Sequence, residues 1–94
     1  MTAERVAAAA AKVRGLVFTG QSHRIAMLVA ANALGVDPAV VWKSVTAERQ
    51  GFVTTRGRWL SRAGAWTLAK EQGQLRWDRS RAGQAPELFS EDLR

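Results

Sequence analysis

The sequence predicts a mainly α-helical domain with one small β-hairpin, in the order helix, helix, helix, hairpin, helix. Two observations lead to this expectation. Apolar residues recur at helical spacing in segments that each end at a glycine. Before the last of these segments, two β-prone stretches flank a short tip that contains Gly57. A chain of 94 residues has room for a single hydrophobic core, so we expect one domain.

The first two helices are predicted from their helix formers and their end signals. Residues 3–14 contain five consecutive alanines among other strong helix formers, and Gly15 is the expected C-cap. Residues 16–18 then form an extended link. The second helix covers residues 22–34, and either Thr19 or Ser22 can supply its hydroxyl cap. Because it is apolar on nearly every side, we expect it to lie centrally or to contact a second protomer.

The third helix has the clearest start signal in the chain. Gly35 ends the second helix, and Asp37 followed by Pro38 matches the preferred N-cap and first helical residue. This helix is predicted to span residues 38–50. The strands of the hairpin follow at residues 52–55 and 58–61, and Ser61 caps a fourth helix that covers residues 62–72. The domain is therefore expected at residues 1–73, with a tail at 74–94 that is first basic and then acidic.

The charge distribution points to a polyanionic partner. Fourteen Lys and Arg residues stand against eight Asp and Glu residues, which gives a net charge of +6. The last twelve residues carry one basic and three acidic side chains, so the positive charge belongs to the body of the chain. Nucleic acid is the commonest partner of such a body. The alternative is that abundant Arg and Ala reflect a GC-rich genome.

The chain offers little for catalysis or metal binding. It has no Cys and no Tyr, and His23 is its one histidine. Disulfides, thiolate metal sites and Cys–His pairs are thereby excluded, and no glycine-rich phosphate motif occurs. We therefore expect no enzyme activity and no cofactor. The N-terminus lacks the pattern of a signal peptide and the longest apolar run is too short for a membrane span, so we expect a cytoplasmic protein.

Two stretches of the sequence resemble a known family. Residues 29–45 are similar to a helix-turn-helix, with small Ala31 at the helix crossing and Gly35 in the turn, although Ser44 stands where an aliphatic residue is usual. Residues 50–53 and 60–65 are similar to the wing of MarR-type regulators. The resemblance covers residues 22–72. It implies a winged helix-turn-helix fold, with three helices, a wing and a fourth helix, in a bacterial or phage DNA-binding regulator.

The resemblance also implies which residues contact DNA. In winged-helix proteins the outer face of the third helix enters the major groove, where Lys43 would meet phosphate and polar side chains would reach base edges. Two arginines beside Gly57 would reach the backbone or the minor groove. The predicted DNA-binding residues are Ala39, Trp42, Lys43, Thr46, Arg49, Gln50, Arg56 and Arg58.

Two functional hypotheses follow. The first is a duplex-DNA-binding transcription regulator or accessory factor, with a possible homodimer through the first or second helix. The second is a protein-binding adaptor or inhibitor on the same scaffold, which uses Trp42 or the acidic tail. RNA binding through the same basic face is a third, weaker possibility. Trp59 and Trp66 are assigned to the core, and Trp77 either stacks on nucleic acid or packs the tail against the domain.

Overall fold

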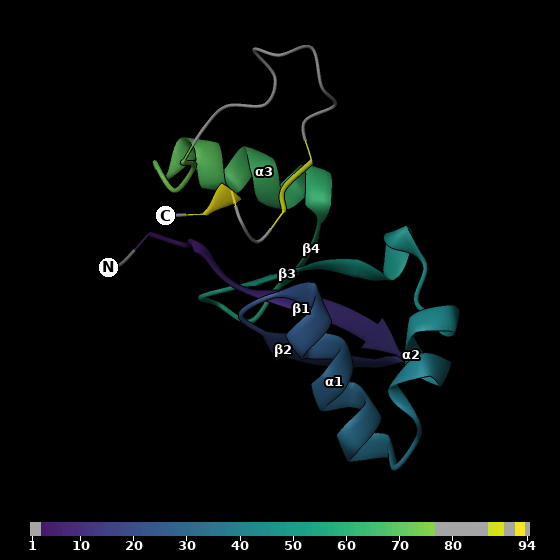
Figure 1. Cartoon of the computed structure of the whole chain (residues 1–94). Helices are drawn as coiled ribbons and strands as arrows, with labels where there is room; N and C mark the ends of the chain where they lie inside the picture. Colours follow the sequence, from purple (N-terminus) through teal and green to yellow (C-terminus); the bar gives the residue numbers. More distant parts are fainter. Residues whose placement is uncertain (1–2, 77–86, 90–91, 94) are drawn as a thin grey trace.

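The computed structural model is an α+β domain built on a four-stranded antiparallel sheet in the order β2-β1-β3-β4 (Figure 1). It describes residues 3–76, 87–89 and 92–93. The mainly α-helical winged-helix fold predicted from the sequence is therefore wrong. The elements are β1 (Val6–Val13), β2 (Leu16–Gly20), α1 (His23–Leu34), α2 (Pro38–Ser44), the short 3₁₀ helix η1 (Ala47–Arg49), β3 (Gln50–Thr54), β4 (Trp59–Ser61) and α3 (Arg62–Glu71).

The largest error concerns the alanine-rich segment, which is the central strand β1 instead of a helix. Ala9, Ala10 and Ala11 are at most 2% exposed, and side chains this small let other groups pack closely over a strand that has neighbours on both edges. Tertiary packing thus overrides the helix propensity of alanine. Gly15, predicted as a helix C-cap, is the second residue of the β1–β2 turn. Both turn residues have positive φ, 52° at Arg14 and 78° at Gly15, as a two-residue hairpin turn of type I′ requires.

The second predicted helix is confirmed as α1, and so are the signals at its two ends. The Ser22 hydroxyl accepts a hydrogen bond from the Ile25 amide at 3.2 Å. Gly35 closes the helix in the left-handed region, with φ of 67°. The Asp37 carboxylate then accepts from the Ala39 amide at 2.8 Å and starts α2. The axes of α1 and α2 differ by 119°, and no single described helix is long and apolar enough to cross a membrane.

The prediction of the third helix over residues 38–50 is too long, because α2 ends at Ser44. The Ser44 hydroxyl donates to the Val41 carbonyl at 3.0 Å, a local bond that competes with helix continuation. Val45 follows in an extended conformation that places its side chain in the core, 8% exposed. Two consecutive β-branched residues, Val45 and Thr46, also disfavour further helix. After η1 the chain enters β3 at Gln50.

The hairpin and the last helix agree with prediction to within about two residues. Strands β3 and β4 pair at Gly51↔Ser61, Phe52↔Leu60 and Val53↔Trp59. The tip contains Gly57, with φ of 77°. The hydroxyl of Ser61 then accepts from the Gly64 amide at 3.2 Å and caps α3 as expected.

Helices α1 and α3 pack on one face of the sheet, α2 packs against α1 at the end of the sheet, and two hydrophobic clusters lie side by side under these helices. Ala9, Phe52 and Leu60 are cross-strand partners and so share this face. The first cluster joins α1 and α2 to the end of β1, and the second joins α3 and the buried tail residue Leu88 to β3 and the start of β1. His23 links the clusters, since its ring meets the edge of Phe52 with centroids 5.0 Å apart.

The opposite face of the sheet carries Trp59, which lies over the backbone of Gly51. A Cβ at position 51 would stand 2.8 Å from Cζ2 of Trp59 and 2.3 Å from the Leu60 carbonyl oxygen. The Lys12 ammonium is 4.4 Å from the centre of the indole ring. The prediction that Trp59 lies in the core is therefore wrong, since its side chain is half-buried on the opposite face. Trp66 is buried in the core as predicted.

The described part of the predicted tail packs against the domain. The Leu88 side chain is fully buried in the second cluster, and its amide donates to the Arg62 carbonyl at 3.0 Å. Leu75 and Leu93 form an isolated antiparallel bridge. Trp77 lies outside the described residues.

Candidate functional site

The predicted DNA-binding residues are divided between two opposite ends of the sheet (Figure 1). We call the β1–β2 turn, α2 and η1 the helix end, and we call residues 3–5 with the β3–β4 turn the hairpin end. Strand β3 leads from one end to the other. Its five residues span about 17 Å. Arg56 and Arg58 therefore lie far from α2, and the single surface expected from a helix with an adjacent wing is not formed.

Three of the predicted residues form an exposed row on α2. Ala39, Trp42 and Lys43 stand at helical spacing, and all three are exposed, Trp42 to 42%. Thr46 and Arg49 lie beyond the end of the helix, although both are exposed at the same end of the sheet. The prediction that Thr46 and Gln50 lie on the outer face of the third helix is therefore wrong.

Gln50 is engaged elsewhere. It lies in β3, is only half-exposed, and its amide oxygen accepts a hydrogen bond from Nη2 of Arg62 at 2.8 Å. The Arg62 guanidinium also stacks on the Phe89 ring, 4.8 Å from its centre. Gln50 thus ties β3 to the start of α3.

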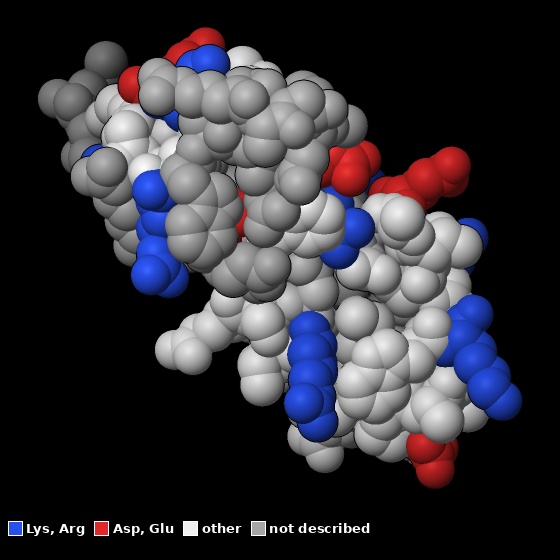
Figure 2. Space-filling view, turned by 45° about the horizontal axis from the view of Figure 1, so that its top comes forward, with Lys and Arg blue, Asp and Glu red and all other residues white. Residues whose placement is uncertain are grey.

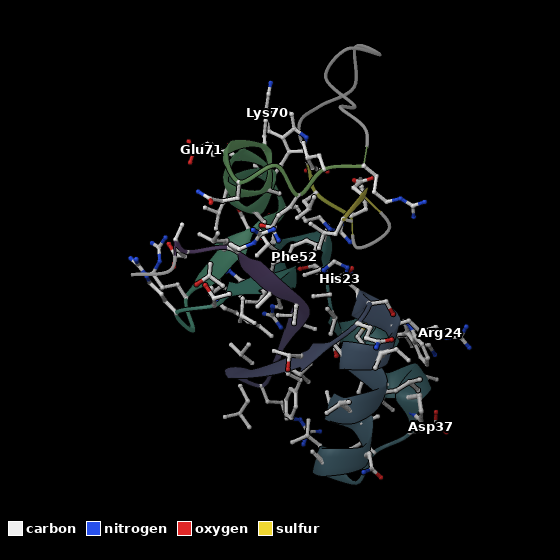
Figure 3. All side chains as sticks on the ribbon, turned by 90° about the vertical axis from the view of Figure 1, so that its left-hand side faces the viewer. His23, Arg24, Asp37, Phe52, Lys70 and Glu71 are labelled. Carbon is white, nitrogen blue, oxygen red and sulfur yellow. The ribbon has the colours of Figure 1, made fainter. Side chains whose placement is uncertain are left out.

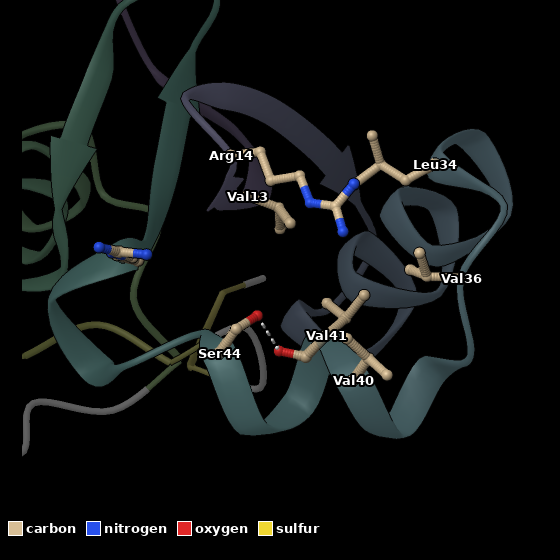
Figure 4. Close-up of a pocket in the computed structure, with 8 residues that line it drawn as sticks. Val13, Arg14, Leu34, Val36, Val40, Val41 and Ser44 are labelled. Carbon is tan, nitrogen blue, oxygen red and sulfur yellow. Dashed lines mark hydrogen bonds between the residues drawn. The ribbon is translucent and has the colours of Figure 1, made fainter.

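A groove lies beside α2, with a cavity volume of about 160 Å³ (Figure 4). Five aliphatic side chains from β1, α1, the α1–α2 turn and α2 line it, together with Ser44 and two arginines. The Ser44 hydroxyl is already bonded to the Val41 carbonyl. Figure 4 shows the Arg14 guanidinium extending over the groove toward Leu34. The lining residues are Val13, Arg14, Leu34, Val36, Val40, Val41, Ser44 and Arg49.

Arg14 is the residue of this site that the sequence analysis missed. Its φ of 52° is the one positive value at a described residue other than glycine, and this conformation costs an L-residue about 1–2 kcal/mol. Among the described residues, neither Arg14 nor Arg49 has a carboxylate partner. Two arginines at the helix end are therefore available for an external anion.

The hairpin end uses its arginine differently. Nε of Arg58 donates to Oε2 of Glu4 at 2.7 Å, and Nη2 bonds the other carboxylate oxygen. The Thr54 hydroxyl also donates to Glu4, at 2.7 Å. These hydrogen bonds, from Arg58 first and Thr54 second, lower the pKa of Glu4 to about 2. The charge of Arg58 is thus already paired within the chain, and Arg56 alone remains of the two predicted cations at the tip.

On the face shown in Figure 2, the described basic side chains do not merge into one patch. Figure 2 shows Lys and Arg side chains standing apart from one another on the face in view, with acidic side chains near several of them. Among the exposed acidic residues near α2 are its N-cap Asp37 and Glu48 of η1. An anion at the helix end would therefore contact a few separate cations.

His23 has a structural position. Its Nε2 lies 2.7 Å from the Gly51 carbonyl oxygen, and its side chain is 8% exposed. Burial lowers its pKa below the ordinary value, which keeps the ring neutral near pH 7. Figure 3 shows His23 next to Phe52, between α1 and the sheet. In the described part of the chain, no three His, Cys, Asp or Glu side chains gather in a way that would hold a metal ion.

Comparison with known proteins gives one match. The model of the family described as Phage T4 y16D protein matches residues 5–93, nearly the whole chain. No curated protein and no solved structure matches the chain significantly.

Proposed function

We propose that this chain, which belongs to the phage T4 y16D protein family, binds duplex DNA through the helix end of its sheet. The observation that supports this most is the combination of an exposed helical row, Ala39–Trp42–Lys43, with two nearby arginines that have no carboxylate partner among the described residues. The net charge of +6 also supports DNA binding, because a positively charged chain attracts a polyanion. The family description itself names no activity.

The dimensions of α2 are compatible with a groove of DNA. With its side chains a helix is about 10–12 Å across, which fits a major groove about 12 Å wide, and the seven residues of α2 give it a length of about 10 Å. In this arrangement Ala39 and Lys43 face the DNA. Arg14 and Arg49, which border the groove beside α2, contact phosphates. Because the row has only two turns, most of the affinity comes from phosphate contacts and little from base reading.

A salt titration tests the proposal. We expect a fluorescein-labelled random-sequence duplex to bind with a log K that falls by about 3 per unit of log[salt], since Lys43, Arg14 and Arg49 would neutralise about three phosphates. Replacing Lys43 or Arg49 by Ala should reduce this slope by about 1 each. Absence of binding at low salt, or a slope near zero, would refute DNA binding.

The matched controls are Arg5→Ala and Arg56→Ala, which each remove an exposed cation from the hairpin end. Both should leave the slope at its wild-type value. An equal reduction by these variants would show that the duplex is held by general charge and not by the helix end.

A further inference from the structure

The groove beside α2 is lined mainly by aliphatic side chains. Its aliphatic lining includes Val40, which is 50% exposed. A cavity of about 150 Å³ accepts a group the size of benzene, so the groove, at about 160 Å³, accommodates one branched aliphatic or aromatic side chain. Water in contact with such a lining is unfavourable, and an apolar group that displaces it gains free energy.

The charges on the rim define the rest of the ligand. Arg14 and Arg49 are the charged residues that line the groove, and both are positive. Ser44 adds no free donor, because its hydroxyl is bonded to the Val41 carbonyl. A complementary ligand therefore combines an apolar body with an anionic group. A nucleic acid backbone carries the anion without an apolar side chain of this size, whereas a polypeptide carries both.

We propose that the groove binds a segment of a partner protein in which a branched or aromatic side chain stands next to a carboxylate. The apolar side chain enters between the end of β1 and α2, beside Val13 and Val40. The carboxylate lies between Arg14 and Arg49. This inference does not require DNA binding, because Val40 and Ser44 stand on the flank of α2 and not in its Ala39–Lys43 row. The two sites share only the arginines.

The experiment uses N-acetyl dipeptide amides as probes of ¹⁵N-labelled protein, followed by backbone amide chemical shifts in the absence of DNA. Acetyl-Leu-Glu-amide should give saturable shifts at Val36, Val41 and Arg49. Acetyl-Ala-Glu-amide lacks the apolar group and acetyl-Leu-Gln-amide lacks the charge, so each should bind at least about fivefold more weakly. Equal affinity of either control probe, or no saturable shift with any probe, would overturn the proposal.

Variants locate the contact. Arg14→Gln and Arg49→Gln should weaken acetyl-Leu-Glu-amide while leaving the uncharged probe unchanged, and Val40→Ser should weaken both. Arg56→Gln, at the hairpin end, is the matched control and should change nothing. Unaltered binding to Arg14→Gln and Arg49→Gln would contradict the assignment. Lys43→Ala separates the two proposals, since it should weaken duplex binding and leave dipeptide binding intact.

Discussion

Both ends of the sheet carry exposed arginines, but the two ends differ in whether an arginine is paired with a carboxylate of the chain. At the hairpin end, the Arg58 guanidinium donates hydrogen bonds to both carboxylate oxygens of Glu4. This ion pair links residues 3–5 to the β3–β4 turn. At the helix end, Arg14 and Arg49 border an apolar groove without a carboxylate partner among the described residues. Both ends look equally basic in the sequence. The comparison shows that the position of a carboxylate, and not the number of arginines, determines which arginine is available to a partner.

The hairpin end is also fastened through its backbone. The Gln74 side chain accepts from the Val6 amide and donates to the Val6 carbonyl, both at 2.9 Å. The segment after α3 thus completes the hydrogen bonding of β1 where that strand begins. The helix end has no equivalent cross-link among the described residues, and its Arg14 is held only by the turn geometry.

The largest effect that tests this contrast is expected for Gln74→Ala. The change leaves the amide and the carbonyl of buried Val6 without partners, so the free energy of unfolding should fall by about 1–3 kcal/mol. Urea unfolding followed by circular dichroism measures it. Gln21→Ala, which removes the same side chain from an exposed site, should have no such effect. A Gln74→Ala variant as stable as wild type would mean that the hairpin end is not fastened in this way.

A second effect arises at His23, which lies between the two clusters. Its folded-state pKa is lowered, mainly by burial, so its contribution to stability is full above the unfolded pKa of about 6.5. As the pH falls below that value, the unfolded chain binds the proton first and stability decreases, until the folded pKa is passed. Wild type should lose more stability than His23→Gln between pH 7.5 and 5.5 in urea titrations. Equal losses would contradict the neutral, buried histidine.

A smaller effect is expected at the helix end itself. Asn tolerates the left-handed region better than Arg, so Arg14→Asn should keep the free energy of unfolding within about 1 kcal/mol of wild type, on the stabilising side. The same variant should lose affinity for the anionic probes. A thermal melt and the dipeptide titration together check the two outcomes. Destabilisation would show that the Arg14 side chain stabilises the fold. Arg14 would then have a structural role like that of Arg58, and the difference between the two ends would be lost.

The smallest effect is a local one on Glu4. Arg58→Ala removes the largest cause of its lowered pKa, so this pKa should rise from about 2 toward 4.5. Arg56→Ala removes only a minor electrostatic contribution and should change it little. Carboxyl carbon shifts of Glu4 across the acidic range give both values. In wild type the ion pair stabilises the fold above pH 4.5 and ceases to do so as the pH falls through 2.

Local signals predicted the parts of the fold that depend on local chemistry. Ser22, Asp37 and Ser61 cap helices as expected, and Gly35 and Gly57 adopt positive φ. The prediction of a helix at the alanine run is wrong because strand alternation cannot be seen when both faces carry the same small residue. The Arg14-Gly15 pair between Val13 and Leu16 is the local sign of the hairpin, and a glycine in this place is equally typical of a helix end.

The candidate site was predicted less well than the helices. The surface row of α2 was identified correctly as exposed, but Arg14 was missed together with the turn that presents it. The pairing of Arg58 with Glu4 joins residues 54 positions apart, and no local pattern encodes it. Gln50 was assigned outward on a helix, whereas the strand it begins turns it toward Arg62.

The central place of β1 in the sheet determines the order in which its two neighbouring strands become available during synthesis. During synthesis β1 and its hairpin partner β2 are made before the other neighbour of β1, since Ala9 pairs with Phe52. A nascent chain that ends before Gln50 therefore exposes one edge of β1, with donors and acceptors open to any extended peptide. Pairing across so long a stretch is slow compared with helix formation. Strand β3, which is made after β1 and β2, thus covers the edge of β1 that would otherwise stay open.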